Sequence, residues 1–246
     1  MVLSDIRKLA REALAGKWGK GALITLIYFL FTFALGFISG LVEDIAFLSF
    51  IIEIAIIVIT IPISFGLIAS FMKLKIGEEV KCYEFFNYGF ANFGRSWKIA
   101  GNILLKMWLP ILLYVLATFA FIFATSFGLV AYTIASSSTF VVVASFIGIV
   151  LFIAAFVYLF VKSLYYALSY IVAYDNENME AKDVVEESQK LMAGNRGKFV
   201  LLQLSFIGWA ILTIFTLYIG MLWLIPYMQV AMVCFYEALK EKNVEE

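Results

Sequence analysis

The feature that most limits the fold of this chain is a run of 38 residues, from Phe199 to Tyr236, without a single charged side chain. A helix that crosses the hydrocarbon core of a bilayer needs about 20 apolar residues. The run is therefore nearly long enough for two crossings, and Gly220 lies near its centre. We expect a tight helical hairpin that turns at Gly220, because glycine is favoured where a chain reverses direction.

The composition of the whole chain is that of a membrane protein. Hydrophobic residues make up 64% of the 246 residues and charged residues 15%, whereas a soluble domain has about 45–50% and about 25% respectively. This balance excludes a soluble globular fold, a disordered chain and a basic nucleic-acid-binding protein. Because the sequence has no histidine, it excludes every catalytic or metal site that needs one, and we expect no metal and no cofactor.

Four further segments are apolar and long enough to cross the bilayer. They cover residues 21–42, 54–72, 107 to about 135, and 140–161. Together with the hairpin in residues 199–236 they bring the predicted total to six transmembrane helices. The predicted fold class is an all-α polytopic membrane protein.

The positions of the basic residues predict the orientation in the membrane. All 18 lysines and arginines precede the first span, follow the sixth, or lie in the connections after the second and fourth spans. Since cytoplasmic loops carry the excess of Lys and Arg, six spans place both termini in the cytoplasm, and we expect the plasma membrane. The outer connections then hold only Glu43, Asp44, the uncharged residues 136–139 and the turn at Gly220.

Three amphipathic segments, residues 4–15, 83–93 and 179–193, each lead into a pair of apolar runs. Each ends at a glycine that is followed four residues later by a lysine. We expect the glycine to let the chain turn from an in-plane helix into the bilayer, and the lysine and nearby tryptophan to hold the turn at headgroup depth. The predicted turn anchors are Gly16, Trp18 and Lys20; Gly94, Trp97 and Lys98; and Gly194, Arg196 and Lys198.

This pattern predicts one transmembrane domain, residues 1–246, made of three repeats of a cytoplasmic interfacial helix and a transmembrane hairpin. The repeat units cover about residues 1–76, 77–176 and 177–246. The alternative is that glycine and lysine are simply common at the inner boundaries of membrane proteins. Ser4 is the expected N-cap of the first interfacial helix. Gly36 and Gly40 fit a close contact between two helices, or stand there by chance.

Lys162 is the basic residue whose depth the sequence leaves open. It lies at the membrane boundary if the fourth span covers residues 140–161, and well inside if the span covers residues 146–172. An ionisable residue inside the membrane marks a functional site by default. Together with Tyr165, Tyr166 and Tyr170, which follow within two helical turns, Lys162 forms the candidate lining of a polar groove.

Several short motifs stand in the second half of the chain: KSLYYALS at 162–169, ESQKLMAG at 187–194, LSFIGW at 204–209, IPY at 225–227 and FY at 235–236. With these motifs the chain resembles a family of uncharacterised bacterial integral membrane proteins, and residues 10–18 and 86–93 fit the first half of that family. The resemblance implies a six-span plasma-membrane protein and brings no assigned activity. The family tends to have a Pro-Gly pair before the lysine that Lys162 matches, whereas residues 156–160 here read FVYLF.

These observations favour a non-enzymatic protein: a scaffold, an immunity-type protein or an accessory subunit of an exporter. Its partners would be lipid and other membrane proteins, and not nucleic acid. The alternative is a small transporter or lipid-handling protein with a polar groove near Lys162. We expect no enzyme activity, because the chain has no nucleophile motif and no paired carboxylates within its apolar runs.

Overall fold

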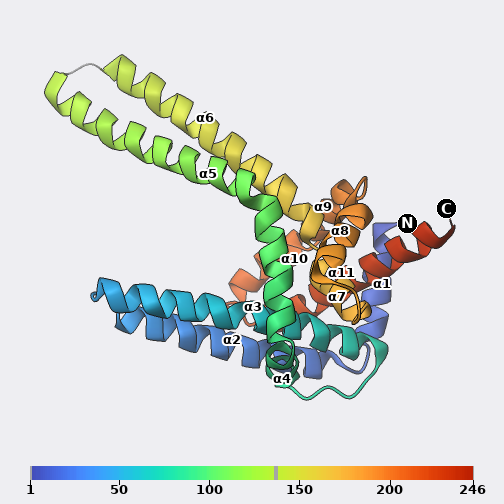
Figure 1. Ribbon diagram of the computed structural model, residues 1–246. Coiled ribbons are helices and arrows are strands. Elements are labelled where there is room, and N and C mark those ends of the chain that lie inside the picture. Colours follow the sequence, from blue (N-terminus) through green and yellow to red (C-terminus); the bar gives the residue numbers. More distant parts are fainter. Residues whose placement is uncertain (1, 136–137, 246) are drawn as a thin grey trace. The chain divides into compact units, whose positions relative to one another are not determined.

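The computed structural model consists of α-helices (Figure 1), and none of the residues that it describes lies in a β-strand. It describes the backbone of residues 2–135 and 138–245, and the side chains of residues 2–126, 143 and 145–242. The elements are α1 (Leu3–Leu14), α2 (Trp18–Leu41), α3 (Ala46–Ile76), α4 (Glu84–Ala91), α5 (Phe93–Ala135), α6 (Ser138–Ser163), the 3₁₀ helix η1 (Leu164–Tyr166), α7 (Ser169–Asp175), α8 (Ala181–Met192), α9 (Arg196–Leu204), α10 (Ile207–Phe215) and α11 (Met221–Glu245).

Six helical stretches are long and apolar enough to cross a membrane, which confirms the number predicted from the sequence. They are Trp18–Leu41, Ala46–Ile76, Phe93–Ser126, Ser145–Asp175, Arg196–Phe215 and Met221–Lys242. The connection predicted at residues 136–139 falls outside the described residues at positions 136 and 137, and Ser138 already begins α6.

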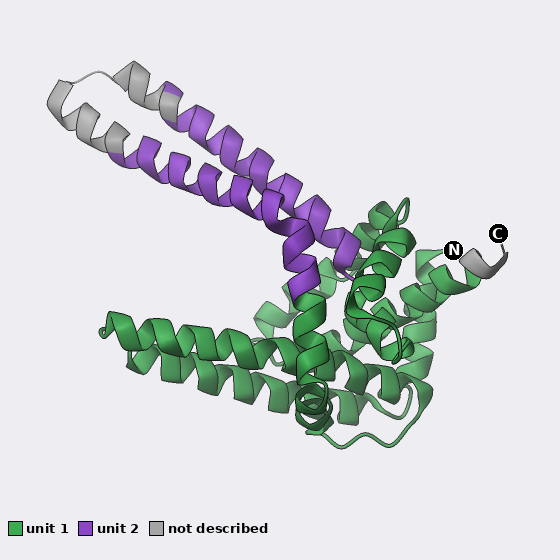
Figure 2. Cartoon of the chain, viewed as in Figure 1, with its two compact units in different colours: residues 1–100, 168–246 green, residues 101–167 purple. Residues whose placement is uncertain are grey.

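The helices pack as two compact units, coloured separately in Figure 2. Residues 1–100 and 168–246 form the first unit, and residues 101–167 form the second. These boundaries differ from those of the predicted repeats, and the repeat organisation stays a prediction.

The second unit is a hairpin of α5 and α6 in which aromatic rings pack between the two helices. The ring of Phe152 lies 5.5 Å from that of Tyr114 and 5.6 Å from that of Phe121. Gly148 brings α6 close to α5, because a Cβ atom placed on it would lie 3.4 Å from the Cα atom of Phe121. A two-helix hairpin cannot bury its outer faces, and Leu116 and Phe123 are accordingly exposed.

In the core of the first unit, short amphipathic helices pack against one end of the apolar hairpins. α1 buries Ile6, Ala10 and Leu14, and α8 buries Val184, Val185, Ser188, Leu191 and Met192. The middle of α11 is buried nearly throughout, from Val230 to Tyr236. In contrast, Phe33 and Phe37 toward the other end of α2 are 74% and 60% exposed. Exposed apolar surface on this scale is expected where helices contact lipid.

The start of α1 differs from the prediction. Its N-cap is Val2, without a side-chain cap, and the hydroxyl of Ser4 donates to the carboxylate of Asp5 (3.3 Å). The assignment of Ser4 as the N-cap was wrong, because the helix begins one residue before it. Ser4 lies inside the first turn, where a hydroxyl cannot serve as the Ncap group.

The hairpin of α2 and α3 turns at residues 42–45, which include the predicted Glu43 and Asp44. Near this turn the hydroxyl of Ser39 donates to the carboxylate of Glu53 (2.5 Å), so that a hydrogen bond joins the two helices. At the other end Gly77 ends α3 with φ +87°, and the backbone N–H of Glu78 donates to the carbonyl of Lys73 (3.0 Å). This is the usual glycine C-cap of a helix.

α3 and α4 cross in direct backbone contact at two glycines. A Cβ atom placed on Gly66 would lie 1.9 Å from the carbonyl oxygen of Phe85, and one on Gly89 would lie 2.4 Å from that of Pro62. Phe85 is fully buried at this crossing. No residue larger than glycine fits at either position without moving one of the two helices.

The last apolar region reverses where the sequence predicts. The turn covers residues 216–220, and the N–H of Tyr218 donates to the carbonyl of Thr213 (2.8 Å). The positive φ values fall on Leu217 (50°) and Tyr218 (65°) rather than on glycine. A second break was not predicted: α9 ends at Leu204, and the hydroxyl of Ser205 donates to the carbonyl of Leu202 (2.6 Å).

The glycine crossing predicts a large and local effect of two small substitutions. Gly66→Ala or Gly89→Ala should each lower the free energy of unfolding by about 1–3 kcal/mol or more, because overpacking forces the helices apart. Gly94→Ala is the matched control, since a Cβ there meets nothing within 4 Å and alanine favours a helix. The stability of the three variants is compared by the thermal midpoint of unfolding of each purified chain in detergent. Equal midpoints for the three variants would contradict the crossing.

Candidate functional site

The structure places Lys162, the centre of the predicted polar groove, in the last turn of α6. Its ammonium nitrogen lies 5.8 Å from the ring centroid of Tyr158 and 5.8 Å from that of Tyr165. Both distances fit cation–π contacts. The structure thus brings Lys162 close to Tyr165 and to Tyr158, which was not among the predicted residues, and places Tyr166 in η1.

Tyr170, the fourth predicted residue of that groove, belongs to the core of the first unit. Its ring stacks on Phe65 at 5.2 Å. Phe65 also contacts Tyr88 (5.4 Å), and Tyr88 contacts Tyr174 (5.5 Å). Tyr170 therefore packs in an aromatic cluster of α3, α4 and α7.

A polar cluster lies where α7 ends, and it links segments far apart in sequence. The carboxylate of Asp175 accepts hydrogen bonds from the hydroxyl of Tyr236 (2.7 Å) and from the ammonium of Lys240 (2.5 Å), both in α11. Arg95, in the first turn of α5, donates to the carbonyl oxygens of Asn176 (2.6 Å) and Met179 (3.3 Å). The cluster thereby holds the connection between α7 and α8 against two other helices.

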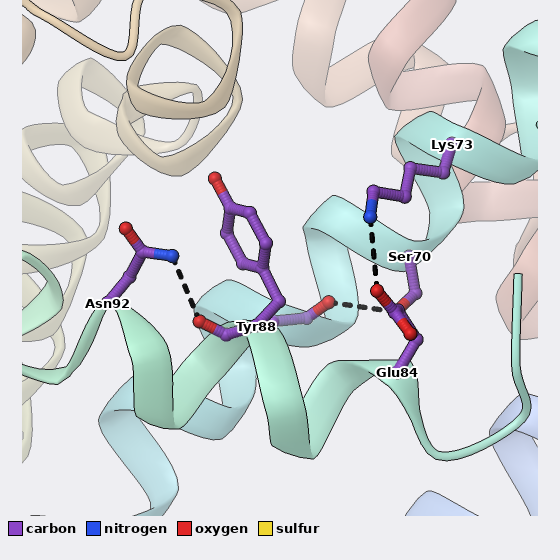
Figure 3. Close-up of polar contacts among 6 residues, drawn as sticks. Ser70, Lys73, Glu84, Tyr88 and Asn92 are labelled. Carbon is purple, nitrogen blue, oxygen red and sulfur yellow. Dashed lines mark hydrogen bonds and ion pairs between the residues drawn. The ribbon is translucent and has the colours of Figure 1, made fainter.

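The end of α3 carries two further ion pairs that cross between elements. Lys75 pairs with Glu237 of α11. Lys73 pairs with Glu84 at the start of α4 (3.1 Å), and its nitrogen lies 5.9 Å from the ring centroid of Tyr88 (Figure 3). These part-buried pairs tie α4 and α11 to the end of α3.

Tyr88 is the titratable group most affected by these surroundings outside the apolar helices. Burial raises the pKa of its hydroxyl, the carboxylate of Glu177 raises it further, and the guanidinium of Arg95 lowers it. The hydroxyl is therefore protonated at neutral pH, and it cannot serve as an anionic base there.

The predicted turn at a glycine is found in two of the three segments. Gly16 has φ +74° and Gly194 has φ +75°, each directly after an amphipathic helix. Gly94 does not form such a turn: it lies inside α5, and the chain turns at Asn92 before that helix begins. The prediction was wrong there because α5 starts one residue before Gly94, so that its backbone is helical.

The remaining predicted anchors lie at the starts of long or apolar helices. The ring of Trp18 contacts that of Tyr227 (6.0 Å). Between Gly16 and Trp18, the ammonium of Lys17 donates to the carbonyl of Leu74 (3.0 Å) and so caps the C-terminus of α3, where a cation is favoured. The others are Lys20 in α2, Trp97 and Lys98 in α5, and Arg196 and Lys198 in α9.

Trp97 has a role that sequence reasoning missed. Pro62 lies inside α3 and has no N–H, so the carbonyl of Val58 lacks its usual partner in the helix. The indole N–H of Trp97 donates to this carbonyl (3.2 Å). In an apolar environment an unsatisfied carbonyl is costly, and this bond ties the start of α5 to α3.

Two of the apolar hairpins carry apolar grooves. On α2 a groove is lined by Phe33, Gly36, Phe37, Gly40 and Leu41. A Cβ atom placed on Gly36 or Gly40 would meet no described atom within 4 Å. On the α5–α6 hairpin, a second groove is lined by leucines, by Tyr158 and by four alanines: Ala117, Ala120, Ala154 and Ala155.

Comparison with known proteins gives one match. A family model described as "Protein of unknown function (DUF975)" matches residues 1–243. The comparisons with curated proteins and with solved structures found no match.

The hydrogen bond of Trp97 predicts a specific coupling between two positions. Trp97→Phe should cost about 1–3 kcal/mol of stability, because it leaves the carbonyl of Val58 without a donor. In a Pro62→Ala background the cost should be smaller, since alanine restores the helical N–H that reaches Val58. Thermal midpoints in detergent for the wild type, the two single variants and the double variant give this coupling energy. Strictly additive effects would show that the two residues do not share the carbonyl.

Proposed function

Because the chain belongs to the DUF975 family of proteins of unknown function, we propose its role from the structure. It is a non-enzymatic multi-pass protein of the plasma membrane that acts as a scaffold or accessory subunit. Its hairpins contact transmembrane helices of other proteins.

The open glycine face of α2 is the observation that supports this proposal most directly. Gly36 and Gly40 are one helical turn apart, and the flanking Phe33, Phe37 and Leu41 are 74%, 60% and 69% exposed. In membranes two helices associate where small residues let their backbones approach closely. Since the described helices of the first unit leave this face uncovered, we infer that a transmembrane helix of a second protein covers it.

The distribution of charge on the first hairpin supports an orientation with both termini in the cytoplasm. Lys17, Lys73 and Lys75 lie together at the end of the hairpin where α2 begins and α3 ends. The opposite end carries Glu43 and Asp44. Basic residues are retained on the cytoplasmic side of a membrane. The amphipathic helices α1, α4 and α8, each followed by apolar helices, support the repeat of an interfacial helix and a hairpin.

The rival proposal, a transporter or lipid-handling protein centred on Lys162, has less support. Tyr158 and Tyr165 surround the Lys162 ammonium with aromatic rings, and Tyr170 packs instead in the aromatic cluster of the first unit. The Lys162 ammonium is itself the cation in these contacts, and it lies at the C-terminal end of α6, where a positive charge is favoured. This arrangement fits a structural role.

Site-specific photocrosslinking in native membranes tests the proposed contact. A photoreactive residue at Phe33, beside the glycine face, should give a crosslinked adduct of one defined mass. The same residue at Ile38, which lies on the opposite side of α2 at 100° per residue, is the matched control and should give none. Gly36→Leu should abolish the adduct at Phe33, because the side chain blocks the close approach. Equal crosslinking at Phe33 and Ile38, or an adduct that survives Gly36→Leu, would contradict the proposal.

A further inference from the structure

A cavity of about 370 Å³ lies in the first unit between α1, the start of α2 and the α10–α11 hairpin. Its volume is in the range of small-ligand sites, which is about 300–1,000 Å³. Three tryptophans, Trp18, Trp209 and Trp223, line it together with aliphatic side chains. Arg11 carries the only charge among the lining residues. No sequence pattern marks this groove, because its residues come from both ends of the chain.

The two threonine hydroxyls that line the groove already have hydrogen-bond partners. The hydroxyl of Thr213 donates to the carbonyl of Ala210 (2.7 Å), and that of Thr216 donates to the carbonyl of Thr213 (3.0 Å). Thr216 also accepts the N–H of Gly220 (3.1 Å). This part of the groove therefore offers a ligand apolar and aromatic contact only.

Arg11, in contrast, makes no ion pair with any acidic side chain that the structure describes. The neighbouring Glu12 pairs with Lys8 (3.9 Å). One helical turn before Arg11, the Nε atom of Arg7 is buried without a described partner, and the hydroxyl of Tyr227 donates to the carbonyl of Arg7 (3.2 Å). Of these two arginines, Arg11 lines the groove, and it brings there a guanidinium charge without a described carboxylate partner. Arginine matches the geometry of phosphate particularly well.

One contact between α2 and α11 shows how far the α10–α11 hairpin extends compared with the α2–α3 hairpin. A Cβ atom placed on Gly21, at the start of α2, would lie 3.0 Å from the Cβ atom of Pro226. A helix rises about 1.5 Å per residue along its axis. Gly220 therefore lies at most about 9 Å along the axis of α11 from Pro226, whereas Leu41 lies about 30 Å along the axis of α2 from Gly21. The α2–α3 hairpin accordingly extends well past the α10–α11 turn (Figure 1).

We propose that the α10–α11 hairpin stays within one leaflet and that its groove with α1 binds an anionic phospholipid of that leaflet. The phosphate lies on Arg11, and an acyl chain lies along Leu212, Trp209 and Trp223. Trp209 and Trp223 are 59% and 46% exposed, so the groove opens toward the surrounding lipid. A lipid fits better than a protein helix because the charge is confined to one end of an otherwise apolar surface. The inference rests on the cytoplasmic orientation proposed above, replaces the expectation that residues 199–236 cross the bilayer twice, and is independent of the partner helix at Gly36.

Lipid titration of the purified full-length chain in non-ionic detergent tests this proposal without a protein partner. A ligand that binds the native state raises the thermal midpoint. Phosphatidylglycerol should raise it more than phosphatidylcholine with the same acyl chains. Arg11→Gln should weaken the apparent affinity for phosphatidylglycerol about tenfold, the loss expected for one hydrogen bond to a charged group.

Two variants complete this comparison. Lys8→Gln removes an exposed charge from the same helix outside the groove, and it should leave the preference for phosphatidylglycerol intact. Leu212→Trp fills the apolar part of the groove and should weaken the binding of both lipids. Equal losses in Arg11→Gln and Lys8→Gln, or a wild type that does not distinguish the two lipids, would overturn the proposal.

A second measurement on the wild type remains decisive if Arg11→Gln fails to fold. Three of the five tryptophans of the chain line the groove. Brominated phosphatidylglycerol should therefore quench the tryptophan fluorescence more than brominated phosphatidylcholine at the same mole fraction, and inorganic phosphate should not reverse it. Equal quenching by the two lipids would overturn the proposal, and reversal by inorganic phosphate would show an anion site in place of a lipid site.

Discussion

The fold depends on the packing of short amphipathic helices against the base of an apolar hairpin. Helices of the length of α4, 8 residues, and α1, 12 residues, are marginal on their own, since isolated helices need about 12–15 residues even with favourable sequences. They form here because each buries an apolar face in a shared core. Between helices in lipid the hydrophobic effect is absent. The apolar burial that the structure describes is accordingly concentrated around these short helices, and the outer parts of the hairpins remain exposed.

Within that core α3 is the element that joins the other helices. Pro62 has no N–H to donate to the carbonyl of Val58, and the indole N–H of Trp97 donates to that carbonyl instead. One turn later, the absence of a side chain on Gly66 allows the backbone of α4 to contact that of α3. At its end, Lys75 pairs with Glu237 in α11. A proline, a glycine and a lysine on one helix thus position three other segments, and each does so by a different interaction.

The sequence was sufficient for the features that depend on local pattern. Hydropathy and charge predicted the six apolar helices, the three amphipathic segments and the reversal near Gly220. It was not sufficient where tertiary packing decides. Gly94 has the same spacing to lysine as Gly16, and yet α5 begins before it. Tyr170 follows Lys162 within two turns, and yet it stacks on Phe65. The hydrogen bonds between Asp175 and α11 and the groove at Arg11 join residues separated by 60 or more positions, and a single sequence carries no signal for such pairs.

In the proposed placement, the charged and buried part of the first unit lies at one membrane boundary, from which the α2–α3 hairpin enters the bilayer. Cysteine labelling with a membrane-impermeant maleimide in intact cells tests this arrangement most directly. The account predicts that Asp44→Cys, at the α2–α3 turn, reacts from outside. It also predicts that the native Cys82, in the connection between α3 and α4, and Lys190→Cys, on the exposed side of α8, react only after the membrane is opened. Labelling of Cys82 or Lys190→Cys in intact cells, or of Asp44→Cys only in opened cells, would contradict it.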